Sequence, residues 1–159
     1  MTNSAFFQFE QDFVDNLRCI PMLVRMKLDT CGIKLKLTHW HHLTPAERQL
    51  LVDWPCSTLT EIKDFHQKLQ TLLINKTGTA ASELPIDPQP AWLDVSMIPE
   101  SVQSKAAEFD INLSLANWQQ FTPSQRFALI KLSRSNHENA NFYPALQEFG
   151  LFGTSNAQD

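Results

Sequence analysis

Three histidines and three cysteines carry the side chains best suited to metal binding or thiol chemistry. His39, His41 and His42 flank Trp40, and imidazole nitrogens are frequent metal ligands. No two of these histidines have the i, i+4 spacing that places a pair of imidazoles on one side of a helix. Because they precede a strong helix start at Thr44, we expect them to lie outside a helix. The sequence therefore predicts no metal site at this cluster.

The cysteines Cys19, Cys31 and Cys56 have separations that fit neither zinc-site nor iron–sulfur spacing. Free cysteine is among the most buried residue types, so we expect structural thiols. The sequence also has no glycine-rich phosphate loop, no GxSxG or HExxH motif and no paired carboxylates. We therefore predict no catalytic residues, no cofactor and no enzymatic activity.

Composition sets the broad class of the protein. The 159 residues, with 43% hydrophobic and 19% charged, fit one globular domain over residues 1–159. The net charge of −4 gives no support to nucleic-acid binding. No apolar run approaches the length of a membrane span, and the N-terminus has no secretory-signal pattern. With few cysteines and no export signal, we expect a cytoplasmic protein.

The elements that position these residues follow from an internal repeat. Residues 20–51 align with residues 98–129 at an offset of 78, and 12 of the 32 aligned positions are identical. We therefore predict two copies of one unit, residues 19–76 and 97–151, joined by a linker over residues 77–91. A polar tail over residues 153–159 is expected to be disordered. The identical pairs include Ile20/Ile98, Pro21/Pro99, Lys27/Lys105, Trp40/Trp118, Thr44/Thr122, Pro45/Pro123 and Arg48/Arg126.

Most of the chain is predicted to be helical. Apolar side chains at helical spacing indicate an N-terminal helix over residues 6–17, and a second helix runs from Pro21 to a stop at Gly32. A long helix with Leu59, Phe65 and Leu69 on its apolar face runs to about Asn75, and Gly78 closes it. The last helix covers residues 142–149. Capping boxes, in which Glu or Gln follows Thr by three residues, begin helices at Thr44, Thr58 and Thr122.

Two short segments alternate apolar and polar residues. They are Ile-Lys-Leu-Lys-Leu over residues 33–37 and Ile-Asn-Leu-Ser-Leu over residues 111–115. The pattern fits one strand per copy, paired across a pseudo-twofold axis, and equally fits extended loops that bury three aliphatic side chains. We therefore predict a mainly α, internally duplicated domain with pseudo-twofold symmetry and at most two short strands, which pair between the repeats.

The repeated tryptophans and arginines have structural interpretations. Trp40 and Trp118 are expected in one shared core together with the leucines of the alternating segments. Arg48 and Arg126 lie at the same place in two capped helices. We expect each guanidinium to bond the strand segment or the other copy.

One helix face is present in the first copy and missing from the second. Arg18, Met22, Arg25, Met26 and Asp29 lie opposite the aliphatic side of the second helix. Exposed methionine beside arginine suits a protein-binding surface. The alternative is that both methionines pack under the N-terminal helix.

Long strings of residues resemble a known family. The first runs from Phe9 through Leu17-Arg18-Cys19-Ile20-Pro21-Met22 to Leu35. The second includes Arg126-Phe127-Ala128-Leu129, His137-Glu138-Asn139 and Glu148-Phe149-Gly150-Leu151. Over residues 8–151 the chain resembles the nitrate reductase associated protein family. The resemblance implies a cytoplasmic, non-enzymatic accessory of assimilatory nitrate reductase, an enzyme with a molybdenum cofactor and an iron–sulfur cluster.

Two functional hypotheses follow. The first is a maturation or assembly factor that binds nitrate reductase or its cofactor-assembly proteins, with the second-helix face, His137 and Asn139 as candidate contacts. The second is a small metal- or cofactor-binding redox protein that uses Cys19, Cys31, Cys56 and histidines such as His137. The sequence favours the first hypothesis, because the cysteines have poor ligand spacing.

Overall fold

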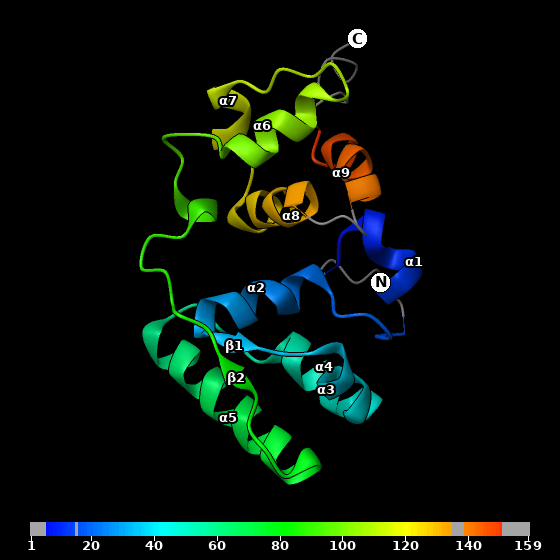
Figure 1. Ribbon diagram of the computed structural model, residues 1–159, viewed down its shortest axis with the longest axis vertical. Helices are drawn as coiled ribbons and strands as arrows, with labels where there is room; N and C mark the ends of the chain where they lie inside the picture. The colour runs from blue at the N-terminus through cyan, green and yellow to red at the C-terminus, as the bar shows by residue number, and fades with distance from the viewer. Residues whose placement is uncertain (1–5, 15, 135–138, 151–159) are drawn as a thin grey trace. The chain divides into compact units, whose positions relative to one another are not determined.

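The computed structural model describes residues 6–14, 16–134 and 139–150 of the chain. This part of the chain is mainly helical and contains one short two-stranded sheet (Figure 1). It divides into two compact units. The first comprises Phe6 and residues 10–88, and the second comprises Phe7–Phe9 and residues 89–150. Among the helices described, none is both long enough and apolar enough to cross a membrane.

The first unit packs its helices around a core that contains Trp40, Phe65 and Leu69. α2 contacts both α4 and α5, and α3 also contacts α5. α5 is the longest helix of this unit, and its buried residues Phe65, Leu69 and Leu73 recur along one side. In chain order the helices are α1 (Gln11–Val14), α2 (Met22–Cys31), α3 (Leu37–His42), α4 (Pro45–Asp53) and α5 (Leu59–Thr77).

The predicted capping boxes begin two helices of this unit, α4 and α5. The amide of Glu47 donates to Thr44 Oγ1 at 3.1 Å, and the amide of Thr44 donates to Glu47 Oε1 at 2.8 Å. Thr58 and Glu61 make the same reciprocal pair at the start of α5. Gly78 ends α5 with a φ of 86°, as the sequence predicts. These helix boundaries therefore follow from local chemistry.

The second unit packs around α8, which carries a nearly continuous run of buried residues over positions 126–130. α8 contacts α6, α9 and the 3₁₀ turns η2 and η3. The capping pair at its start is formed as predicted, because Thr122 Oγ1 accepts from the amide of Gln125 at 3.1 Å. The elements are η2 (Ala91–Leu93), α6 (Glu100–Ala107), α7 (Leu115–Gln120), α8 (Pro123–Arg134), η3 (Asn139–Asn141) and α9 (Phe142–Glu148).

Three helix starts in the first unit have counterparts 78 residues later. The pairs are Met22 and Glu100, Leu37 and Leu115, and Pro45 and Pro123. Each unit buries one of its two tryptophans completely, Trp40 in the first and Trp118 in the second. Trp40 belongs to the core of the first unit, whereas Trp118 lies in the second. The expectation of one shared core for both tryptophans is therefore wrong.

The predicted pairing of strands between the repeats is also wrong. β1 (Ile33–Lys34) pairs antiparallel with β2 (Ser82–Glu83), which lies within the predicted linker, and residues 111–114 form no strand. The linker is held beside β1 because the side-chain amide of Gln70 bonds both backbone groups of Ala81. Ala81 N–H donates to Gln70 Oε1 at 2.8 Å, and Gln70 Nε2 donates to the Ala81 carbonyl at 2.9 Å.

Three helical predictions need correction. The described residues of the N-terminal segment form a 3₁₀ turn, η1 (Gln8–Glu10), and the four-residue α1 instead of a helix over residues 6–17. The histidine cluster lies on α3, although we expected it outside a helix. Leu59, expected on the apolar face of α5, is 79% exposed because it is the first residue of the helix.

Candidate functional site

The C-terminal end of α6 is the rim of an open hollow in the second unit. The chain turns at Asp110, whose φ of 61° lies in the left-handed region. The amide of Asp110 donates to the Ala107 carbonyl at 3.0 Å, and the amide of Ile111 donates to the Ala106 carbonyl at 3.0 Å. A left-handed residue after a helix redirects the chain, and aspartate tolerates this conformation better than most residues. The chain leaves α6 as residues 111–114, which we call the open segment.

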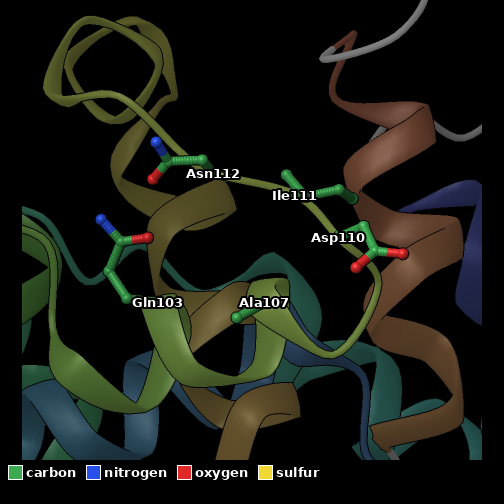
Figure 2. Close-up of a pocket in the computed structure, with 5 residues that line it drawn as sticks. All are labelled: Gln103, Ala107, Asp110, Ile111 and Asn112. Atoms are coloured by element: carbon green, nitrogen blue, oxygen red, sulfur yellow. The ribbon is translucent and has the colours of Figure 1, made fainter.

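The hollow has a volume of about 600 Å³ and is bordered by the open segment and α6 (Figure 2). Gln103 and Ala107 project from α6, while Asp110, Ile111 and Asn112 lie on the chain that leaves it. Gln103 and Ile111 are half-buried, and the other three are exposed. Gln103 Nε2 donates to the Leu113 carbonyl at 3.1 Å, which ties α6 to the open segment.

The open segment has main-chain groups that bond no described residue. Across the residues that the structure describes, no protein group bonds the Asn112 amide or the Asp110 carbonyl. The Asp110 carboxylate likewise has no ion pair with any described side chain. An extended backbone with free amides and carbonyls is a template for pairing with another extended chain.

The equivalent position in the first unit is already covered. Gly32 lies 78 residues before Asp110, follows α2 and has a φ of 82°. The amide of Leu84 donates to the Gly32 carbonyl at 2.8 Å, directly after the β1–β2 pairing. A Cβ atom on Gly32 would lie 2.8 Å from both the Leu84 carbonyl oxygen and Ile86 Cγ1. Glycine is therefore needed where the chain after β2, at Leu84 and Ile86, crosses the helix end. The open segment has no such covering strand among the described residues.

The second-helix face predicted as a docking surface is less exposed than its sequence pattern suggests. Met22 is only 4% exposed, so the prediction of an exposed methionine is wrong at this position. Its amide donates to Oε1 of the buried Glu10 at 3.0 Å, because the N-cap Pro21 supplies no side-chain cap. The N-terminal segment thus covers the start of α2, which agrees with the alternative interpretation for Met22.

The other candidate contacts differ in their exposure. Arg18 is exposed, whereas Arg25, Met26 and Asp29 are half-buried. Arg25 Nε donates to the Ile20 carbonyl at 3.2 Å, so part of its guanidinium serves the backbone. His137 lies outside the described residues. Asn139 is placed only by its backbone, at the start of η3, and its side chain is not described.

Two of the three thiols, Cys31 and Cys56, lie in settings that favour the protonated form. Burial raises the pKa of Cys31 to about 12 and that of Cys56 to about 11. Cys19 is half-buried, and all three cysteines are free thiols. Lys27, near Cys56, donates from Nζ to the carbonyls of Val52 and Trp54 at 2.6 Å each. Lys27 thus caps the end of α4, which is a structural task.

The histidine cluster also has a structural role. His39 Nδ1 accepts from the Lys36 amide at 3.1 Å, and His42 Nδ1 lies 2.7 Å from the Thr38 carbonyl. Burial, followed by Lys36 and His42, lowers the pKa of His39, which suits a ring nitrogen that accepts a hydrogen bond. Within the described ranges, no three His, Cys, Asp or Glu side chains form a group that could hold a metal ion.

Sequence reasoning missed the hollow because its residues carry no motif. The available signal was the exchange of Gly32 for Asp110 at aligned positions, the first directly after α2 and the second three residues after the end of α6. The absence of a second long helix after the second copy's capped helix was a further sign that this copy has fewer covering elements. Both signals point to the end of α6 rather than to the histidines or cysteines.

Comparison with known proteins gives one match. A family model described as conserved nitrate reductase-associated protein matches residues 6–149, which is nearly the whole chain. No curated protein and no solved structure was found to match.

Proposed function

This chain belongs to the family of conserved nitrate reductase-associated proteins, and we propose that it is a non-enzymatic accessory protein of nitrate reductase. In this proposal it supports the maturation or activity of a molybdenum-dependent assimilatory nitrate reductase. It does so by binding the enzyme or the proteins that assemble its cofactors. The family match over residues 6–149 is the observation that carries the proposal.

The settings of the reactive side chains favour a binding role over a redox role. A thiol acts as nucleophile or metal ligand in its thiolate form, and burial opposes that form at Cys31 and Cys56. Lys27, His39 and Arg126 bond backbone groups of their own unit. The proposal therefore assigns the protein no cofactor and a cytoplasmic location beside its client.

We also propose that the two units arose by internal duplication and are related by pseudo-twofold symmetry. The matched helix starts and the left-handed residues Gly32 and Asp110 support this origin. The first unit then gained a covering element, α5 with β2. The second unit kept the corresponding helix end open, which makes it the better candidate for contact with a client.

A gene deletion tests the proposed function. In nitrate-using cells, removal of this protein should lower nitrate reductase activity per unit of nitrate reductase polypeptide, and the wild-type gene should restore it. Growth on ammonium is the control and should not change. Unaltered nitrate reductase activity in the deletion strain would contradict the proposal.

A further inference from the structure

We propose that the open segment pairs, as a β-strand edge, with an extended peptide segment of the client protein, and that a basic side chain of that peptide meets Asp110. The proposal rests on the proposed function, because the peptide belongs to nitrate reductase. It assigns the contact to one place, the hollow at the end of α6, and to one mode, main-chain pairing.

The first unit supplies the template for this pairing. There β2 joins β1 with Ile33 opposite Glu83 and Lys34 opposite Ser82, and the Leu84 amide bonds the Gly32 carbonyl at 2.8 Å. The occupant is a short extended stretch, Ala-Ser-Glu-Leu-Pro-Ile over residues 81–86. Its main chain makes the pairing, so the occupant needs an extended shape more than a particular sequence.

The second unit offers the same backbone groups, and no described residue pairs with them as β2 pairs with β1. The Asp110 carbonyl corresponds to that of Gly32, and Ile111 and Asn112 correspond to Ile33 and Lys34. In the part of the chain that the structure describes, the Asp110 carbonyl and the Asn112 amide are unpaired. The hollow of about 600 Å³ beside them has room for a chain with side chains.

The exchange of Gly32 for Asp110 determines which side chains the incoming peptide should carry. Close approach of Leu84 and Ile86 over Gly32 requires the absence of a Cβ atom. Asp110 instead carries an exposed carboxylate that has no ion pair among the described residues. Its charge favours lysine or arginine on the incoming peptide. Ala107 and Ile111 give the neighbouring position an apolar floor.

Overlapping 12-residue peptides that cover nitrate reductase, immobilised as an array, are the probe. The full-length protein should bind a peptide with a lysine or arginine next to an apolar residue. For that peptide, N-methylation of the amide that faces the open segment should weaken binding about tenfold, because it removes a donor and keeps every side chain. Equal binding of the methylated peptide overturns the proposal.

Protein variants give a second readout that does not depend on which amide is methylated. Asp110→Lys should lower the affinity for the chosen peptide by more than about fivefold. Asp110→Asn, which fits the left-handed turn, should lower that affinity less. Glu100→Gln removes an exposed carboxylate at the opposite end of α6 and is the matched control, with unchanged binding. If Asp110→Lys binds the peptide as tightly as the wild type does, the proposal is also overturned.

Co-purification of full-length proteins separates the two levels of the argument. Failure of the wild-type protein to co-purify with nitrate reductase would contradict the proposed function itself. A wild-type complex that Asp110→Lys leaves equally abundant would overturn only the edge-pairing proposal. A complex that forms with the wild type and with Glu100→Gln, and is depleted with Asp110→Lys, supports both.

Discussion

Trp40 and Arg48 donate hydrogen bonds to the same acceptor, the carbonyl oxygen of Leu17. Trp40 Nε1 lies 2.8 Å from it and Arg48 Nη1 lies 3.0 Å from it. Leu17 has a φ of 60°, which is unusual for a bulky residue. The two bonds hold that turn in place and join the chain before α2 to α3 and α4. In the second unit the corresponding Arg126 bonds three carbonyls, those of Trp92, Trp118 and Phe121.

The first prediction concerns these arginines. Arg48→Gln should lower the free energy of unfolding by about 1–3 kcal/mol, because buried carbonyls lose charged donors. Arg126→Gln should cost more, since Arg126 is only 5% exposed. Urea unfolding monitored by tryptophan fluorescence measures both. The exposed Arg18→Gln is the control and should change stability by less than about 0.5 kcal/mol. An Arg126→Gln variant as stable as this control would contradict the structural role.

The second prediction uses the pair of left-handed helix ends. Gly32→Ala should lower the free energy of unfolding by more than about 1 kcal/mol, because its Cβ would meet Leu84 and Ile86 at a φ of 82°. Asp110→Gly should leave stability unchanged or raise it by up to about 1 kcal/mol, because strain at a φ of 61° is relieved. Thermal and urea unfolding of the two variants tests this. The opposite order of stabilities would show that the two helix ends are not equivalent.

A third prediction reverses the expectation for the second-helix face. Met22→Glu should destabilise the protein by more than about 2 kcal/mol, because it places a carboxylate at a buried position beside that of Glu10. Met26→Gln, at a half-buried position, is the matched control and should have a smaller effect. Circular dichroism and urea unfolding measure the helix content and the free energy of unfolding of both variants. A folded Met22→Glu protein of wild-type stability would restore the exposed-face interpretation.

The fourth prediction concerns alkaline pH. A thiol whose folded pKa is raised above its unfolded value stabilises the fold at low pH, and this contribution is lost as the pH rises toward the folded pKa. For Cys31, with a folded pKa of about 12 against an ordinary 9.0, stability should fall above pH 9 by up to about 1.4 kcal/mol per pH unit. Cys31→Ala should show a shallower decline. Val24→Ala, a buried truncation that cannot ionise, should retain the wild-type slope. Equal slopes for the wild type and Cys31→Ala would contradict the prediction.

Much of the fold could be predicted where the determinants are local. The helix starts at Thr44, Thr58 and Thr122 follow from reciprocal side-chain caps within four residues, and the ends at Gly32 and Gly78 follow from glycine. The helix that carries the histidines was missed because His39 acts as its cap, a role that sequence patterns seldom assign to histidine. Its counterpart α7 has a readable signal, the Ser114–Asn117 capping pair.

The candidate site was harder to predict because it depends on tertiary contacts. Whether residues 33–37 and 111–115 become strands is decided by what lies beside them, and alternation alone cannot reveal the neighbour. Gln70 anchors Ala81 and brings β2 to β1, whereas no described strand reaches the open segment. The burial of Met22 likewise depends on Glu10, twelve residues away in sequence.

The most direct test of the account is a binding measurement between the purified protein and purified nitrate reductase. Calorimetric titration of the wild-type protein into the cofactor-free and the cofactor-loaded enzyme should detect a saturable complex with at least one of the two forms. Asp110→Lys should weaken that complex, and Glu100→Gln should not. No heat of binding and no co-elution with either form, at concentrations of tens of micromolar, would contradict the account.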